Sequence, residues 1–413
     1  MTANAIEIRL AQCLACGSEE NHAIGVWDHM PLSILALPES LEEARNAPTY
    51  TLDVRRCATC GHVWHTKFDT EEVSYKDRSN LVWNAGHSWA EYQDSLALHW
   101  IRSLGLENGR VVEVGAGDGG FLQRFHEAGC RCIAWEPGPD AEGCAARGLE
   151  VRRAYFGEAD VIEVRPDAVI CRHVIEHLSD PVSFLRDIRR GAIEAGIAPL
   201  FLAEVPRIDK ALSHCRMNDF LYEHVSHFTE ESFRVLFEHA GWEVLDTRSG
   251  YGDEVVSLVA RPRRRRRKRS EGLPTEREAI KRSSKAFHES IRQQAARIRG
   301  IVRVWGEAGE RVALWGATGK GAALINMCGL TEDVAPHVVD SDPRKHGRFV
   351  PGTGQRIESP ERCRELGVTR VLVCTPWRAR DIEHEIRNVH GLSCDIFVYH
   401  KRSIALLTDE LAL

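Results

Sequence analysis

Residues 219–228 read Asp-Phe-Leu-Tyr-Glu-His-Val-Ser-His-Phe, so two imidazoles, two carboxylates and one phenol lie within ten positions. An imidazole has an ordinary pKa near neutrality and can remove or return a proton, which makes this segment a candidate acid/base centre. The same residues would also suit a polar strand at the edge of a surface sheet. The segment alone favours neither interpretation, so the elements around it must decide.

Two Cys-x-x-Cys pairs stand near the N-terminus, Cys13 with Cys16 and Cys57 with Cys60. A turn of this kind directs two thiolates to one side of a metal ion, and two such turns supply the four sulfurs of a tetrahedral Zn²⁺ site. Residues 17–56 separate the pairs, a longer spacing than in a compact zinc ribbon. We predict a structural zinc site with no open coordination position; free thiols and a redox pair are the alternatives.

A glycine-rich turn follows the apolar run at 111–114 and precedes a helix-like segment. The backbone could approach a ligand closely at three glycines, Gly115, Gly117 and Gly119. Glu113 precedes the turn, where its carboxylate could pair with a cationic group. Glu136 ends the next apolar run, 19 residues after Gly117, where a carboxylate hydrogen-bonds a ribose diol. The pattern predicts a nucleotide site, with NAD or a bare glycine turn as alternatives because the glycine motif alone is weak.

Apolar runs alternate with helix-like segments between about residues 90 and 260, the pattern of a βαβ domain. A similar alternation begins near residue 312 and contains a second glycine turn, 316–321. Lys320 in that turn adds positive charge, so the turn could cradle a phosphate; a scaffold turn and a second dinucleotide site are the alternatives. One long polar helix is predicted at about 275–306. The fold class is therefore α/β, with two Rossmann-like units.

The length, composition and net charge of the chain limit the classes of function that it can have. The chain has 413 residues, 43% of them hydrophobic, which is enough for two or three globular units. A formal net charge of −6 argues against a general nucleic-acid-binding protein. No secretory signal or membrane-spanning run is recognisable, so we expect a cytoplasmic protein with reduced thiols and no membrane contact. The basic run at 261–269 is interpreted as a solvated linker rather than a nucleic-acid patch.

Taken together, these landmarks resemble the zinc-containing C-methyltransferases that use S-adenosylmethionine to methylate 4-keto nucleotide sugars. The resemblance runs from Cys13 to about residue 390 and is carried by the stretches 111–125, 167–181, 204–213, 219–228, 316–330, 338–353 and 373–377. It implies a zinc-binding Cys₄ module at 1–75 and a class I methyltransferase domain at 76–260. A basic linker with the long helix would follow at 261–306, and a substrate-binding α/β domain at 307–413.

The resemblance identifies the expected nucleotide as S-adenosylmethionine. Asp167 and the run that follows it resemble the family's second cofactor motif, a strand that ends beside the adenine and the methyl donor. His177, later in that run, is expected only to cap or pack the next helix. The predicted cofactor-binding residues are Glu113, Gly115, Gly117, Asp118, Glu136, Pro137, Asp167, Arg172 and His173.

The resemblance also assigns roles within 219–228. His224 would be the general base that removes the acidic proton beside the ketone, so that the carbon can accept the methyl group. Glu223 would orient the imidazole or hold a sugar hydroxyl, and Tyr222 is placed with these catalytic residues. The acceptor, a small molecule and most simply a nucleotide sugar, would meet His227, Lys320, Arg344 and Lys345.

The chain departs from the family pattern on the acceptor side. Leu221 and His227 stand where the family has tyrosines, and 251–254 lack the family's glycine pair. Two other functions therefore remain open at this point. One is an O- or N-methyltransferase of the same architecture; the other is a zinc module that binds S-adenosylmethionine or nucleic acid without catalysis.

Overall fold

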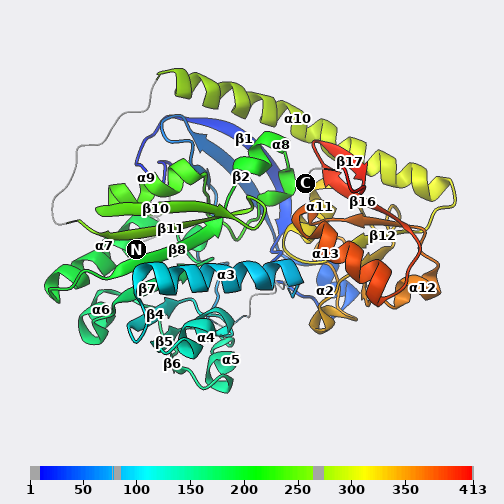
Figure 1. Cartoon of the computed structure of the whole chain (residues 1–413). Coiled ribbons are helices and arrows are strands. Elements are labelled where there is room, and N and C mark those ends of the chain that lie inside the picture. The colour runs from blue at the N-terminus through cyan, green and yellow to red at the C-terminus, as the bar shows by residue number, and fades with distance from the viewer. Residues whose placement is uncertain (1–9, 77, 79–84, 264–273, 412–413) are drawn as a thin grey trace.

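The computed structural model describes residues 10–76, 78, 85–263 and 274–411. They form an N-terminal sheet, a central sheet and a C-terminal sheet (Figure 1). Across these ranges, no helix is both long enough and apolar enough to cross a membrane. Most of the basic run, 264–269, lies outside the described residues, so its predicted role as a linker stays a prediction.

The N-terminal sheet is antiparallel and takes its fourth strand from far along the chain. Its order is β1 (Asn21–Pro31), β2 (Thr49–Cys57), β3 (Val63–His65) and β9 (Ser226–His227), with α2 (Leu41–Arg45) between β1 and β2. Strand β9 belongs to the acid/base segment 219–228, and residues 215–229 are all buried. The segment is therefore the seam between two parts of the protein and not a surface edge.

The central sheet has the order β10–β11–β8–β7–β4–β5–β6. All neighbouring strands are parallel except where β11 pairs with β8 and β10. The strands are β4 (Arg110–Val114), β5 (Arg131–Trp135), β6 (Glu150–Arg152), β7 (Ala168–Arg172), β8 (Leu200–Pro206), β10 (Trp242–Gly250) and β11 (Val255–Pro262). The helices are α3 (His87–Leu104), α4 (Gly120–Glu127), α5 (Ala141–Ala146), α6 (Glu158–Val164), α7 (Pro181–Glu194), α8 (Asp209–His214) and α9 (Glu230–Ala240).

A helix cap ends the acid/base segment on its C-terminal side. The side chain of Thr229 accepts a hydrogen bond from the backbone N–H of Ser232, and the Ser232 hydroxyl accepts one from the N–H of Thr229. This reciprocal capping box satisfies two donors at the start of α9. The chain is therefore fixed where it leaves the short strand β9, which helps to hold His224 and His227 in place.

The C-terminal sheet has the order β14–β13–β12–β15–β16–β17, and only β17 is antiparallel to its neighbour. This order is that of a Rossmann fold, in which ligands bind where the strand order reverses, here between β12 and β15. The strands are β12 (Val312–Trp315), β13 (His337–Val339), β14 (Ile357–Glu358), β15 (Arg370–Val373), β16 (Asp395–His400) and β17 (Ser403–Leu406). The helices are α11 (Lys320–Cys328), α12 (Arg362–Leu366) and α13 (Ala379–His384).

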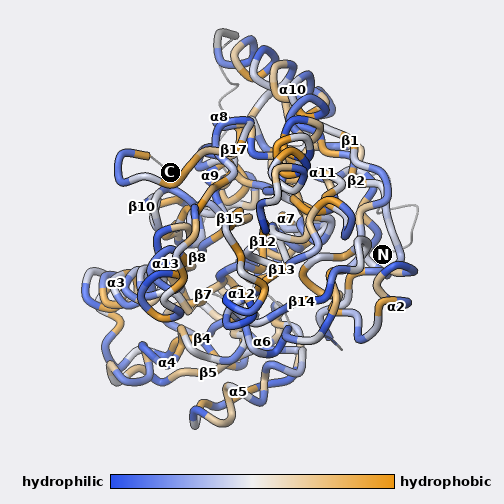
Figure 2. Tube along the Cα trace, turned by 90° about the vertical axis from the view of Figure 1, so that its right-hand side faces the viewer, coloured by the Kyte–Doolittle hydropathy of each residue, from blue (hydrophilic) through white to orange (hydrophobic). Residues whose placement is uncertain are grey.

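The long helix predicted at about 275–306 is present as α10 (Pro274–Glu307) and braces the molecule. Figure 1 shows it passing over both the N-terminal sheet and the C-terminal domain, and it contacts β1, β12 and β17. Its apolar buried residues, Phe287, Ile291, Ile298 and Val302, recur at helical spacing. Figure 2 shows hydrophilic and hydrophobic residues mixed along this helix, as expected when only one face packs inward.

Candidate active site

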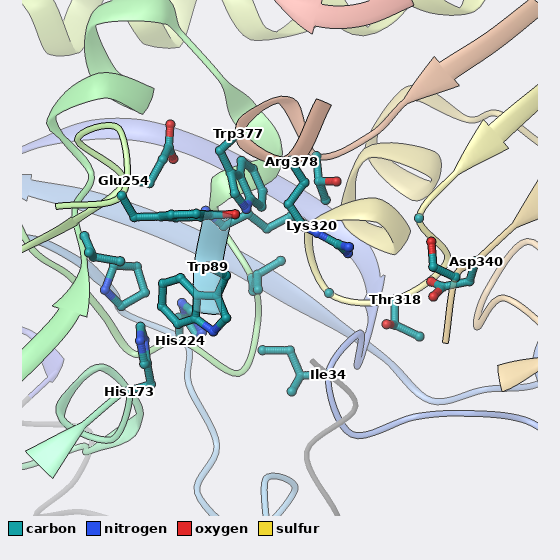
Figure 3. A pocket seen from close by; sticks show the side chains of 18 of the residues that line it. Ile34, Trp89, His173, His224, Glu254, Thr318, Lys320, Asp340, Trp377 and Arg378 are labelled. Atoms are coloured by element: carbon teal, nitrogen blue, oxygen red, sulfur yellow. The ribbon is translucent and has the colours of Figure 1, made fainter. Parts of the chain in front are cut away.

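A cavity of about 350 Å³ lies where the three parts of the protein meet. The N-terminal module contributes Ile34, the central domain contributes Trp89, His173 and His224, and the C-terminal domain contributes Thr318 and Trp377, among others (Figure 3). A cavity of this volume suits a small-molecule ligand. The walls near Trp89 and Trp377 are aromatic, whereas the imidazoles lie on the central-domain side.

In both α/β domains, the carboxyl ends of the strands at the point where the strand order reverses lie at this cavity. In the central sheet, the strand order reverses between β4 and β7, and His173 follows β7 directly. In the C-terminal sheet, the reversal lies between β12 and β15, and Gly316 and Thr375 follow these strands. Because such crevices are the ligand sites of doubly wound sheets, the cavity joins two of them.

His224 lies two residues before the start of β9 and lines the cavity, with 7% of its surface exposed. Its ring packs edge-on against the ring of His177, with centroids 4.7 Å apart. Burial lowers the pKa of His224 well below its ordinary value, and the neighbouring imidazoles, His177 first, act in the same direction. The ring is therefore neutral at pH 7 and can accept a proton.

His173 lies in the same cavity with the opposite charge state. Burial alone would lower its pKa, but Glu176 and Glu204 outweigh this effect and raise the pKa to about 9. Its Nε2 lies 3.1 Å from a carboxylate oxygen of Glu204, and its Nδ1 lies 3.6 Å from one of Glu176. The backbone at His173 is left-handed, with φ of 54°. One cavity thus holds a neutral imidazole and a cationic imidazole.

The raised pKa of His173 leads us to predict how the free energy of unfolding changes with pH. Its pKa is raised above the unfolded value of about 6.5, so its stabilising effect is complete below that pH and is lost as the pH rises through about 9. Its side chain is 32% exposed, and after a discount for this exposure we expect a loss of about 1–2 kcal/mol. His173→Gln should abolish this alkaline loss, as urea unfolding at pH 6.5 and pH 9.5 would show.

A buried charge network lies beside the C-terminal wall of the cavity. Arg216 donates to both Asp219 and Glu254, and the ammonium of Lys320 lies 2.5 Å from Asp219. Lys320 also lies 4.1 Å from the centre of the Trp377 ring. The positive charge of Lys320 is therefore matched by Asp219 before any ligand arrives.

Two family models match the chain. Residues 89–247 match a methyltransferase domain, and residues 260–391 match a C-methyltransferase C-terminal domain. The chain is also 27% identical over 372 residues to C-methyltransferase NovU of Streptomyces niveus, an alignment that covers 85% of this chain and 86% of that protein. The chain is a C-methyltransferase that depends on S-adenosylmethionine.

Solved structures resemble parts of this methyltransferase. The magnesium protoporphyrin IX methyltransferase of Synechocystis PCC 6803 is 12% identical, with a TM-score of 0.34 over 42% of this chain and 84% of that one. The 1,6-didemethyltoxoflavin-N1-methyltransferase of Burkholderia thailandensis is 18% identical, with a TM-score of 0.32 over 43% of this chain and 81% of that one. Both similarities cover fewer than half of the residues of this chain.

The first glycine turn of the methyltransferase fits S-adenosylmethionine. Gly115 and Gly117 have φ of 67° and 55°; a side chain on Gly115 would meet Val174 at 2.3 Å, whereas no atom lies within 4 Å of the corresponding position on Gly117. Gly117 therefore leaves its side of the turn open. Oε2 of Glu113 is buried and has no hydrogen-bond partner among the described residues, and burial raises the pKa of this carboxyl to about 8. A cationic ligand group would supply the missing partner and favour the ionised form.

Glu136 follows β5, and hydrogen bonds hold its carboxylate beside this turn. One of its oxygens accepts from the N–H of Gly117 at 2.9 Å, and the other accepts from the N–H of Gly138 at 2.8 Å. These bonds fix the carboxylate where it can also accept from a ribose diol. Pro137 lies next to it in the chain, at the same edge of the sheet.

Glu136→Ala should weaken the binding of S-adenosylmethionine by about 10–100-fold, because a hydrogen bond to a charged group contributes about 1.5–3 kcal/mol. Isothermal titration calorimetry would measure the change. Glu127→Ala, which removes an exposed carboxylate from the end of α4, is the matched control and should leave the affinity unchanged. Equal affinities for both variants would contradict the assignment of Glu136.

The prediction that Asp167 binds the cofactor is wrong. Asp167 precedes β7 and accepts a hydrogen bond from the N–H of Arg110, at the start of the parallel strand β4. The glycine turn follows the other end of β4, so Asp167 lies at the opposite edge of the sheet, a strand length of roughly 15 Å away.

Asp118 and Arg172 are at the correct edge but are engaged with the protein. Asp118 accepts from the N–H of Gly120 at the start of α4 and pairs with Arg147. Arg172 is buried, donates to Glu204 and lies over the ring of Phe121. Their predicted contact with the cofactor stays a prediction, and the structure shows both holding the local framework.

The carboxylate of Glu223 is directed to the N-terminal module, not to the cavity. It accepts from the N–H groups of Ser33, Ile34 and Leu35 at 2.6, 2.5 and 3.3 Å. The residue is completely buried. The backbone carbonyl of Glu223 accepts from Nδ1 of His177 at 2.9 Å. Glu223 therefore fixes the loop that carries Ile34 and, through its carbonyl, the neighbour of His224.

Tyr222 and His227 also point away from the main cavity. Tyr222 stacks on Tyr50 with ring centroids 4.6 Å apart, and its hydroxyl donates to the carbonyl of Lys67. His227 is buried against Phe220 and lines only a small void of about 10 Å³ beside Lys320. A catalytic role for Tyr222 and contact of His227 with the acceptor are untested, and this geometry does not support either.

Of the remaining residues predicted to contact the acceptor, two line the cavity and one does not. Lys320 and Lys345 line the cavity, whereas Arg344 does not and pairs with Asp342. Lys345 is buried between Asp340 and Asp342. The second glycine turn presents few donors: the N–H groups of Gly316, Ala317, Gly319 and Gly321 all have partners within the protein. This arrangement supports a structural turn better than a phosphate cradle.

The four cysteines predicted to bind zinc come together. Their Sγ atoms lie within 4.8 Å of one another, with Cys13 to Cys60 and Cys16 to Cys57 each 3.6 Å apart. The N–H of Thr59 donates to Sγ of Cys57 at 3.3 Å. Four convergent thiols with such support are the donor set of a closed tetrahedral site.

Several residues of the cavity were not predicted. His177 was expected only to cap or pack a helix, yet it lines the cavity beside His224. Trp89, Tyr251 and Trp377 form aromatic walls. The Glu-His pair at 176–177 was a usable signal because both side chains can bind or transfer protons, but a single tryptophan carries no such signal.

Proposed function

We propose that the methyltransferase transfers a methyl group to the carbon beside the ketone of a nucleotide-linked 4-keto sugar. The observation that carries the proposal is His224, a neutral buried imidazole in a cavity that the methyltransferase domain shares with the C-methyltransferase C-terminal domain. Transfer to carbon requires prior removal of a C–H proton, and a neutral imidazole in contact with the cavity has a free lone pair with which to accept it.

The walls of the cavity support a sugar linked to a nucleotide. The rings of Trp89 and Tyr251 contact each other with centroids 4.8 Å apart, and Trp377 of the C-terminal domain also lines the cavity. Aromatic faces of this kind can pack against a sugar ring or a base. The ammonium groups of Lys320 and Lys345 line the C-terminal end of the cavity; both are paired with aspartates, and each has three N–H donors, so they can add hydrogen bonds to a ligand there. The proposal therefore places the keto sugar near His224 and the nucleotide towards Trp377.

In the proposed reaction, His224 accepts the proton from the carbon beside the ketone. The cationic ring of His173 lies in the same cavity, and its charge favours the negative charge that develops on the ketone oxygen. S-adenosylmethionine, when bound, supplies an electrophilic methyl group. The aromatic walls exclude water and orient the sugar so that the deprotonated carbon faces the glycine turn.

Solvent exchange tests this proposal. The full-length protein would be incubated in D₂O with a panel of nucleotide 4-keto sugars, without S-adenosylmethionine, and the sugars would be analysed by mass spectrometry. We expect deuterium in one sugar of the panel and, after addition of S-adenosylmethionine, the gain of one methyl group on the same carbon. If S-adenosylmethionine binds but no keto sugar exchanges or gains mass, the acceptor is a different carbon acid.

We also propose that Cys13, Cys16, Cys57 and Cys60 hold one structural Zn²⁺ ion. Elemental analysis should find one zinc per chain, and Cys57→Ser should lose the metal and unfold at a lower temperature. Cys130→Ser, which changes a buried cysteine of the central domain, is the control and should keep its zinc. A wild-type protein without zinc would contradict the assignment.

A further inference from the structure

Three potential metal ligands converge at the edge of the cavity, apart from the four cysteines. Glu176, His177 and His224 each offer one ligand atom, and these atoms lie within 4.8 Å of one another. Glu176 is only 2% exposed, and its Oε2 has no hydrogen-bond partner among the described residues. A buried carboxylate oxygen without a partner is costly, so the group is suited to bind a cation.

The hydrogen bonds of His177 leave the correct nitrogen for a metal. Its Nδ1 lies 2.9 Å from the carbonyl oxygen of Glu223, which can only accept, and 2.8 Å from the hydroxyl of Tyr75, which can accept or donate. The contact with the carbonyl requires a proton on Nδ1, with Tyr75 as a second acceptor, and in that tautomer the lone pair is on Nε2. A metal-binding histidine usually donates its other nitrogen to a carbonyl or carboxylate in this way. The carbonyl of Glu223 therefore favours the tautomer of His177 that a metal ligand needs.

Two imidazole nitrogens and one carboxylate oxygen form a common ligand set for Zn²⁺, Co²⁺ and similar ions, and three protein ligands leave further positions for water. Such an ion lies about 2.0–2.2 Å from each ligand, which places the ligand atoms roughly 3.5 Å apart, so side chains whose ligand atoms now lie within 4.8 Å of one another would have to close around the ion. The nearby imidazole of His173, 3.6 Å from the other oxygen of Glu176, would help to orient the carboxylate.

We propose that Glu176, His177 and His224 form a second metal site, which binds a borderline-soft divalent cation, and that the bound ion inhibits methyl transfer. Inhibition follows because an imidazole bound to a metal has no lone pair with which to accept a proton. The binding part of the proposal is independent of the proposed function. The inhibition part rests on it, because it takes His224 as the base.

Titration of the full-length protein with Co²⁺ tests the binding. The visible absorption of Co²⁺ bound to nitrogen and oxygen ligands should saturate at one equivalent, without the near-ultraviolet thiolate band that Co²⁺ in the cysteine site would give. Glu176→Gln and His177→Gln should each weaken this binding by more than the roughly 10–100-fold that loss of an outer hydrogen-bond partner costs. His214→Gln, which alters a histidine near His400 outside the cavity, is the matched control.

Activity is measured in the same titration. We expect turnover to fall in proportion to the occupancy of the site and to return when a mild chelator removes the Co²⁺. No saturable N/O-type absorption, or equal affinity in wild type and both Glu176→Gln and His177→Gln, would overturn the site. Binding at the site with undiminished turnover would overturn the inhibition and the role of His224 as base. If no keto sugar is methylated, the absorption titration still decides whether the site exists.

Discussion

His224→Asn should lower kcat by about 10²–10⁴-fold, the usual contribution of a general base, while the affinity for S-adenosylmethionine stays unchanged. The glycine turn and Glu136 lie after β4 and β5, whereas His224 lies before β9, so the substitution leaves the expected cofactor contacts intact. The same variant should lose deuterium exchange into the keto sugar. Steady-state kinetics, calorimetry and exchange together separate loss of proton transfer from loss of binding.

The control for this variant is His214→Asn, which changes a histidine at the end of α8, outside the cavity. It should retain wild-type turnover. Turnover of His224→Asn within a few-fold of wild type would contradict the assignment of the base. Loss of turnover together with full retention of deuterium exchange would place His224 in a later step.

The two glycine turns and the cysteine pairs were predictable because each depends on local sequence. An apolar strand, a glycine turn and a helix occupy consecutive residues, so the pattern at 111–125 specifies its own geometry. A Cys-x-x-Cys pair likewise sets the direction of two thiols within four residues. The assignment of Asp167 failed because this residue lies just before the start of β7, whereas the glycine turn follows the end of the parallel strand β4, one strand length away.

The seam around His224 was not predictable, because it depends on residues far apart in the chain. Strand β9 has two residues and pairs with β3, more than 160 positions earlier. The partners of the Glu223 carboxylate lie 188 to 190 positions away. A strand so short has no periodicity to detect, and no rule of spacing links a carboxylate to backbone groups of another module. Ion pairs between distant residues are equally hard to predict. The sequence around Lys320 indicated a phosphate ligand, because nothing in it shows that Lys320 pairs with Asp219, 101 residues away.

Glu223→Gln should destabilise the protein and lower turnover together. The three backbone N–H groups all donate to Oε1 of Glu223 in a fully buried position, and the Ser33 hydroxyl donates to Oε2. A glutamine can keep its carbonyl oxygen in the Oε1 position, but the neutral oxygen accepts more weakly than a carboxylate, so replacement should cost about 1–2 kcal/mol. Urea unfolding would measure this loss, and Glu43→Gln, at an exposed position on α2, provides the control.

The effect of Glu223→Gln on turnover distinguishes positioning from proton transfer. The substitution would loosen the loop that carries Ile34 and shift the carbonyl that holds His177, so the base would be displaced beside the substrate. A displacement of about 1 Å can cost roughly 100-fold in rate. We therefore expect kcat to fall by about 10–100-fold while the shape of its pH profile is unchanged, because the substitution leaves His224 and His173, the titrating imidazoles of the proposed reaction, in the cavity. A changed profile with undiminished stability would instead show that the carboxylate of Glu223 takes part in the proton transfer, and the N-terminal module would then have no role in positioning the base.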